Sequence, residues 1–153
     1  MDILELERSF MSVYTKFKLS FYKKIFRRFE TREASLTAVE TFCVEVINAL
    51  ERPTINEFAQ FVNISQANAA YKIQSLVDKG YVTKTRSPDD RREYFLAVTE
   101  RFNNYNSLST EYIGEVLRRM RERLSPEDME KFKFFLDTMS TELMPEVELN
   151  LNH

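Results

Sequence analysis

The stretch TINEFAQFVNISQANAAYKIQSLVDKGYVTKTRSPDDRREYFLAV, residues 54–98, decides the fold. It opens on a helix start signal, because Thr54 can cap the first helical turn while Glu57, three residues on, bonds back to it. Apolar residues then recur at the spacing of one helical face, and Asn63 can end the helix in a left-handed conformation. The residues of this face are Ile55, Phe58, Ala59 and Val62. The first part of the stretch is therefore predicted to be a short helix.

A second helix is predicted from Ser65, whose hydroxyl can cap its first turn, to Gly80, which suits a helix stop. One face is apolar, and the other carries hydrogen-bonding side chains with no acid before Asp78. Such a face suits a DNA major groove, because base edges present donors and acceptors while phosphates repel carboxylates. An ordinary solvated face is the alternative. The candidate DNA-contacting residues are Ser65, Gln66, Asn68, Tyr71, Lys72 and Ser75.

After Gly80 the pattern changes from helical to strand-like. Residues 81–86 and 93–98 are rich in β-branched and aromatic side chains, and SPDDRR between them supplies a turn that contains proline. A hairpin with a basic tip can reach a phosphate backbone or a minor groove. The candidate residues on it are Lys84, Arg86, Asp90, Arg91 and Arg92. Two short helices followed by such a hairpin predict a winged helix-turn-helix.

In these features the chain resembles the MarR family of bacterial transcriptional regulators. The resemblance rests on the spacing of the two helices, on the segment LVDKGYVTKTRSPDDRREYFLAVTE and on helical extensions at both sides. It implies that Arg92 is directed at the minor groove and that Asp90 is its positioning partner. One departure stands after the hairpin, where Arg101 and Phe102 occupy positions at which the family often has a glycine.

Composition suits one mostly helical globular unit, with 153 residues, 43% hydrophobic and 30% charged residues, and only two glycines. The net charge of −2 argues against nucleic-acid binding over the whole surface. The local balance differs, because bases exceed acids between residues 72 and 92. No apolar run is long enough to cross a bilayer, and MDILELE lacks the features of a signal peptide, so we expect a cytoplasmic protein without membrane association.

Long helices are predicted on both sides of the central stretch. One covers residues 2–29, a second begins at a capping box of Thr37 and Glu40, a third runs from residue 99 to about 124, and a last one starts at SPED, residues 125–128. The expected fold is mainly α (α+β). Its predicted parts are an N-terminal dimerisation helix, 1–34, a DNA-binding core, 35–98, and C-terminal dimerisation helices, 99–153.

A homodimer is expected, because the apolar faces of the terminal helices exceed what the small core can cover. A twofold dimer would place two recognition helices in successive major grooves of a pseudo-palindromic site, with half-sites about 10 base pairs apart. The resemblance further implies a repressor and an effector crevice for a small aromatic or acyl compound. The candidate lining residues are Tyr14, Phe17, Phe21 and Phe42.

The sequence offers no catalytic constellation, and its sole histidine, His153, has no second ligand at metal-binding spacing. We therefore expect neither an enzyme nor a bound metal or cofactor. Cys43, the single cysteine, is expected to be a small core residue rather than a redox sensor. The alternative function is a winged-helix module that binds another protein through its outer helix face.

Overall fold

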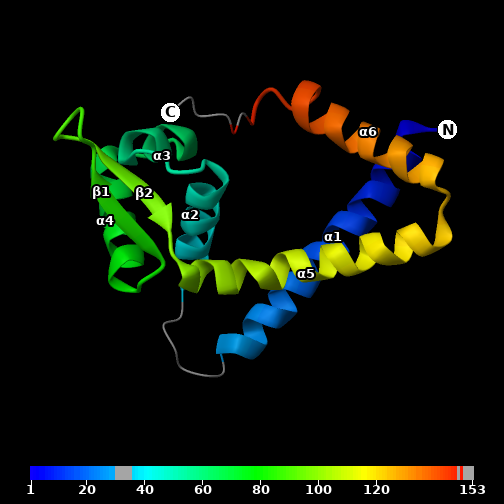
Figure 1. Ribbon diagram of the computed structural model, residues 1–153, viewed down its shortest axis with the longest axis horizontal. Helices are drawn as coiled ribbons and strands as arrows, with labels where there is room; N and C mark the ends of the chain where they lie inside the picture. The colour runs from blue at the N-terminus through cyan, green and yellow to red at the C-terminus, as the bar shows by residue number, and fades with distance from the viewer. Residues whose placement is uncertain (30–35, 148, 150–153) are drawn as a thin grey trace. The chain divides into compact units, whose positions relative to one another are not determined.

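The computed structural model describes residues 1–29, 36–147 and 149. Their secondary structure, labelled in Figure 1, is mainly helical with a two-stranded hairpin. The elements are α1 (Ile3–Phe29), α2 (Ala38–Ala49), α3 (Ile55–Val62), α4 (Gln66–Asp78), β1 (Val82–Arg86), β2 (Tyr94–Val98), α5 (Glu100–Arg123) and α6 (Pro126–Glu142). The predicted fold class is confirmed.

The chain forms two compact units. Among the described residues, the winged unit contains 36–105 and 149, and the helical unit contains 1–29 with 106–147. In this division the winged unit includes the first turns of α5. The physical reason is that the first turns of α5 carry Phe102 and Tyr105, which are both buried.

Local capping signals begin and end the helices of the winged unit. The Thr37 hydroxyl accepts a hydrogen bond from the Glu40 amide, and the Glu40 carboxylate accepts one from the Thr37 amide, which confirms the predicted capping box. Thr54 caps α3, which ends at Asn63 in a left-handed conformation with φ 57°. Ser65 then caps α4. These signals place α3 and α4 as the predicted helix-turn-helix.

The core of the winged unit is formed where α2, α3 and α4 meet the hairpin (Figure 1). α2 contacts α4 and β2, while α3 packs against α4 and the same strand. The side chains at the centre are fully buried. They include Val44, Ile47, Phe58, Ile73, Leu76 and Leu96. The side of α4 that carries Ile73 and Leu76 faces this core. The opposite side of α4 is therefore exposed.

The hairpin pairs β1 and β2 antiparallel, from Val82 opposite Val98 to Arg86 opposite Tyr94. It is joined to the loop before α3, because the Leu96 amide donates to the Pro53 carbonyl at 2.8 Å. The observed strands begin one residue later than the predicted ranges 81–86 and 93–98. The hairpin is therefore anchored through the middle of β2 to the loop before α3.

The helical unit contains α1, α6 and the part of α5 from residue 106 onward. Ser125 caps α6 and Pro126 stands in its first turn, as predicted. None of the described side chains of this unit is buried, although α6 carries exposed apolar residues such as Phe135 and Leu136. Gly114 of α5 has open space around it within the chain, because a Cβ there would meet nothing within 4 Å.

Among the described helices, none combines the length and the apolar character that a membrane span requires.

Candidate nucleic-acid interface

The outer face of α4 presents polar side chains on the surface of the winged unit. Asn68 is exposed, and Tyr71 has 78% of its surface accessible. Lys72 is half-buried. Gln66 is exposed but donates from Nε2 to Asn56 Oδ1 of α3 at 2.7 Å, so its amide is already oriented by the preceding helix. Asn68, Tyr71 and Lys72 thus lie on one side of α4, while Gln66 is turned towards α3.

Ser75 and Ser65 have structural partners. The Ser75 hydroxyl donates to Glu40 Oε1 of α2 at 2.5 Å. The Ser65 side chain accepts the Asn68 amide as the cap of α4. Ser75 is therefore turned towards α2, a role that the polarity of the helix face did not reveal.

The C-terminal half of α4 is also joined to β1 by side chains. Gln74 Nε2 donates to Asp78 Oδ1 at 2.8 Å, and Lys84 Nζ donates to Gln74 Oε1 at 2.9 Å. This arrangement connects the predicted wing residue Lys84 to α4. Gln74 was not among the sequence-based candidates, because its contact is set by the position of the hairpin relative to α4.

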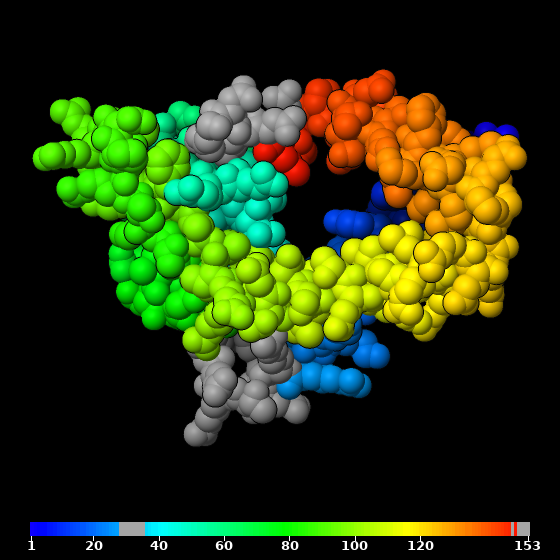
Figure 2. Space-filling view, in the orientation of Figure 1, coloured from blue at the N-terminus to red at the C-terminus, as the bar shows by residue number. Residues whose placement is uncertain are grey.

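The turn between the strands is held by its own polar groups. The Asp90 carboxylate accepts a hydrogen bond from the backbone amide of Arg92 at 2.9 Å. The Ser87 amide donates to the Glu93 carbonyl, also at 2.9 Å. The side chains of Arg91 and Arg92 are exposed. Figure 2 shows this turn projecting from the rest of the winged unit. Asp90 thus orders the backbone that presents Arg92.

Tyr94 supports two basic residues of the hairpin. Arg86 Nη2 donates to the Tyr94 hydroxyl at 3.0 Å, and the Lys84 ammonium lies 5.4 Å from the centre of the ring. The hydrogen bond from Arg86 and its positive charge lower the pKa of Tyr94. Tyr94 was not among the residues predicted from the sequence. The strand register shows its role, because Arg86 and Tyr94 are directly paired across the hairpin.

The residues that depart from the family pattern stabilise the junction between α4 and α5. Arg101 Nη1 donates to the Lys79 carbonyl at 3.2 Å, and its guanidinium lies 5.0 Å from the centre of the Tyr81 ring. Phe102 is fully buried. The Thr99 hydroxyl donates to the carbonyl of Gly80 at 2.6 Å. Arg101 therefore helps to satisfy the C-terminal carbonyls of α4.

Cys43 lies in α2 and is buried, as expected for a core residue. Burial raises the pKa of its thiol. A thiol held in its protonated form is a weak nucleophile, so this environment favours a packing role.

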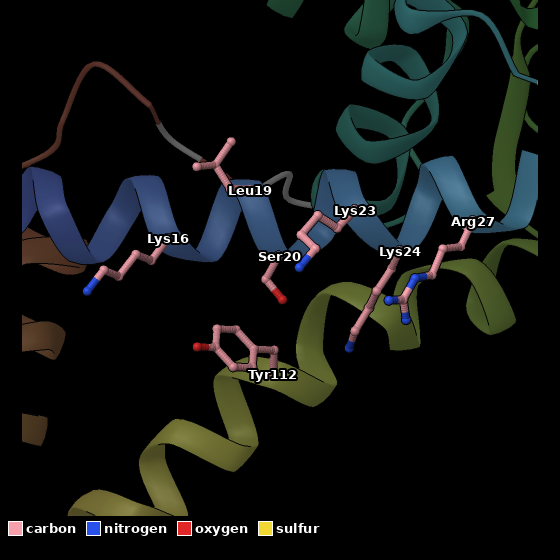
Figure 3. Close-up of a pocket in the computed structure, with 7 residues that line it drawn as sticks. All are labelled: Lys16, Leu19, Ser20, Lys23, Lys24, Arg27 and Tyr112. Atoms are coloured by element: carbon pink, nitrogen blue, oxygen red, sulfur yellow. The ribbon is translucent and has the colours of Figure 1, made fainter.

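The helical unit contains a groove between α1 and α5 with a volume of about 370 Å³. Figure 3 shows the side chains of Ser20, Lys24 and Arg27 directed from α1 towards α5, where the ring of Tyr112 faces them. Lys24 donates to the Leu108 carbonyl at 3.2 Å and lies 3.5 Å from Glu111. The full lining is Lys16, Leu19, Ser20, Lys23, Lys24, Arg27 and Tyr112. The groove is therefore strongly basic.

The four predicted effector residues do not line this groove. Tyr14, Phe17 and Phe21 lie on α1 of the helical unit, whereas Phe42 lies on α2 of the winged unit and is 59% exposed. Phe17 packs edge-on against Tyr112, with ring centres 5.8 Å apart. Phe17 is thus adjacent to a groove residue without lining the groove itself.

Comparison with known proteins identifies the central segment. Residues 36–94 match the model of the MarR family. No curated protein matches the sequence at a significant level.

Several solved structures share the fold. The chain is similar to the transcriptional regulator Tm0710 from Thermotoga maritima, with 20% identity, a TM-score of 0.62, and coverage of 90% of this chain and 92% of that one. It is similar to Streptococcus pneumoniae FabT, solved in complex with DNA, with 16% identity, a TM-score of 0.64, and coverage of 95% and 100%. A Staphylococcus aureus MepR mutant gives 16% identity, a TM-score of 0.66, and coverage of 91% and 97%.

Proposed function

We propose that this chain is a sequence-specific DNA-binding transcriptional regulator that acts as a repressor, because residues 36–94 match the model of the MarR family. The observation that carries the proposal is the exposed polar face of α4 beside a hairpin that projects two arginines. A helix face rich in donors and acceptors reads base edges, and arginines on a hairpin contact phosphates or a minor groove.

The two parts of this surface have different tasks in the proposed complex. Asn68, Tyr71 and Lys72 of α4 meet base edges and nearby phosphates in the major groove. Arg92 enters the minor groove, and Arg91 contacts a phosphate. Lys84 and Arg86, which contact Tyr94, contribute positive potential behind the turn. Ser75 has a hydrogen-bonded partner in α2, so we assign it to positioning rather than to base contact.

A homodimer supplies the second recognition helix. The support for it is the helical unit, where Phe134, Phe135 and Leu143 of α6 are 64%, 59% and 66% exposed within one chain. Large exposed apolar patches mark interaction sites, and a second copy of the same helices offers a matching apolar face. The dimer then prefers half-sites about 10 base pairs apart.

The basic groove of the helical unit supports a small anionic effector. Lys16, Lys23, Lys24 and Arg27 supply positive charge, and Tyr112 supplies an aromatic face. Among the described residues, Lys24 is the only one of these four cations that has a carboxylate within 4 Å, namely that of Glu111. An aromatic or acyl carboxylate matches this combination. By favouring a protein conformation that does not match the DNA site, such a ligand weakens repression through its differential affinity.

Benzoate and benzyl alcohol test this effector, because they share a ring and differ in charge. Benzoate is expected to weaken DNA binding, and the double substitution Lys23→Gln and Arg27→Gln is expected to remove this effect. Lys131→Gln on α6 is the matched charge control. Equal effects of the charged and the neutral probe would overturn the proposal of an anionic effector.

The alternative function is a winged-helix module whose α4 face binds a protein. The acidic overall balance, with a net charge of −2, is compatible with it. The two functions differ in their dependence on salt, because DNA binding releases several counterions and weakens steeply as salt increases.

The test measures binding to duplex DNA over a series of salt concentrations, with Arg92→Ala beside the wild-type protein. The variant is expected to lose roughly 1–3 kcal/mol of specific binding free energy while the dimer stays folded. Arg121→Ala, in the last turn of α5, is the control for loss of one arginine. Unchanged affinity in Arg92→Ala would remove the role assigned to the wing.

A further inference from the structure

We propose that Glu40 is a positioning residue for DNA recognition: one carboxylate at the start of α2 fixes the C-terminal half of α4. This inference rests on the proposed function and adds a residue outside the recognition helix and the wing. Glu40 is a positioning residue because its side chain contacts the C-terminal half of α4, whereas the proposed DNA-contacting residues of this helix lie in its N-terminal half.

The carboxylate joins two helices with both of its oxygens. Oε1 accepts the Ser75 hydroxyl at 2.5 Å, and Oε2 accepts the Lys79 ammonium at 2.7 Å. Oε2 also accepts the backbone amide of Thr37 at 2.8 Å, which belongs to the capping box of α2. Ser75 and Lys79 stand four residues apart and thus on the same side of the end of α4. A single side chain therefore ties the first turn of α2 to the last turn of α4.

The surroundings make this tie stronger than an ordinary surface ion pair. The side chain of Glu40 is 12% exposed and that of Lys79 is 30% exposed. Burial alone would raise the pKa of Glu40, but the hydrogen bonds from Lys79, Ser75 and Thr37 lower it to about 2. The carboxylate is consequently ionised at neutral pH, and its hydrogen bonds are charge-assisted.

A fixed helix end matters because α4 reads bases along its length. A helix of 13 residues is about 20 Å long, so a tilt of about 5° about one end moves the other by about 2 Å. Hydrogen bonds to base edges tolerate only a few tenths of an ångström. Loss of the tie should therefore reduce recognition of one sequence more than attraction to any duplex, which depends on phosphate charge.

Two further contacts hold the same end of α4 from other directions. Lys84 of β1 bonds Gln74, and Arg101 of α5 bonds the Lys79 carbonyl. Glu40 supplies the contact from α2. Because three elements converge here, removal of Glu40 is expected to shift α4 rather than to unfold it, so binding can be measured in the variant.

The capping box gives a matched pair of variants. Ser75→Ala removes a bond from α4 to Glu40 and leaves the cap of α2 intact, whereas Thr37→Ala removes the cap hydroxyl and leaves both bonds from α4. Glu40→Gln retains the shape of the side chain but removes the charge opposite Lys79. A role in stability alone predicts that binding follows the melting temperature in all of these variants. A positioning role predicts that specific DNA binding weakens only in the variants that lose a contact between Glu40 and α4.

The experiment measures the affinity of the full-length protein for a selected specific duplex and for an unrelated duplex, together with the melting temperature. Glu40→Gln and Ser75→Ala are expected to weaken specific binding about tenfold and non-specific binding less than about twofold. Thr37→Ala is expected to lower the melting temperature and to change specific binding less than about twofold.

A double substitution distinguishes positioning from direct contact by Ser75. If Ser75 acts through Glu40, adding Ser75→Ala to Glu40→Gln causes little further loss of specific binding. An additive loss would mean that Ser75 contacts DNA itself and would overturn its place in the tie. Unchanged specific affinity in Glu40→Gln, or an equal loss in Thr37→Ala, would overturn the inference for Glu40. Failure of the wild-type protein to bind any duplex would instead overturn the proposed function.

Discussion

The winged unit and the helical unit bury their apolar side chains to different extents. Among the described residues, every buried side chain lies between Leu36 and Tyr105, within the winged unit. The helical unit is built from long helices that carry many aromatic and aliphatic residues, yet none of its described side chains is buried. The winged unit thus has a core of its own, whereas the described apolar side chains of the helical unit are exposed or half-buried within the chain.

The largest expected effect is in the winged core. Phe58→Ala removes a fully buried ring and should lower the free energy of unfolding by roughly 3–5 kcal/mol, because it leaves a cavity at the contact of α3 with α4. Urea unfolding followed by circular dichroism measures the change. A loss below about 1 kcal/mol would contradict the assignment of this region as the stable core.

The next effect concerns the apolar face of α6. Phe135→Glu is expected to convert the proposed dimer into monomers, since a carboxylate would be buried without a partner in the interface. Sedimentation velocity measures the change, with Glu130→Gln as an exposed control on the same helix. A monomeric wild-type protein, or a variant that remains dimeric, would show that a second copy does not cover this face.

A smaller effect is expected from the charge of Glu40. Its pKa in the folded protein is about 2, below the ordinary value of 4.5. A lowered folded-state pKa stabilises the protein above about pH 4.5, and this contribution is lost as the pH falls through about 2. The stability advantage over Glu40→Gln, about 1–2 kcal/mol at neutral pH, should therefore shrink on acidification. Urea unfolding of both proteins down to about pH 3 measures it, and a constant difference would contradict the ion pair.

The smallest effect is expected at Gly114. Replacing it with alanine should stabilise α5 by up to about 1 kcal/mol, because alanine favours helix and its Cβ meets open space within the chain. Gly80→Ala is the opposite control, since Gly80 has φ +80° and alanine is strained there. Melting temperatures compare the two. A destabilised Gly114→Ala would indicate that the partner copy approaches α5 closely at this point.

Local signals explain why much of the fold was predictable. Thr37, Ser65 and Ser125 cap their helices through hydrogen bonds within the next few residues, so sequence spacing is sufficient to find them. The left-handed Asn63 and the turn at Gly80 are equally local. The polar face of α4 and the basic hairpin were also visible, because each follows from the period of its own element.

Contacts between elements were not predictable in the same way. Ser75 has the polarity of a DNA-contacting residue, but its hydroxyl is used by Glu40, 35 positions earlier in the chain. Gln74 is placed by the hairpin, and Arg101 by the start of α5, where the neighbouring Phe102 is fully buried. Such roles depend on how separate helices and strands are positioned by the core. The basic groove between α1 and α5 likewise required knowledge of which turns of the two helices face each other.

The most direct test of the account is selection of bound duplexes from a random DNA library, with wild-type protein and Arg92→Ala side by side. We predict an enriched pseudo-palindrome with half-sites about 10 base pairs apart, which the variant binds poorly. No enrichment at moderate salt by a protein shown to be an intact dimer would contradict the claim that α4 and the wing read a DNA sequence.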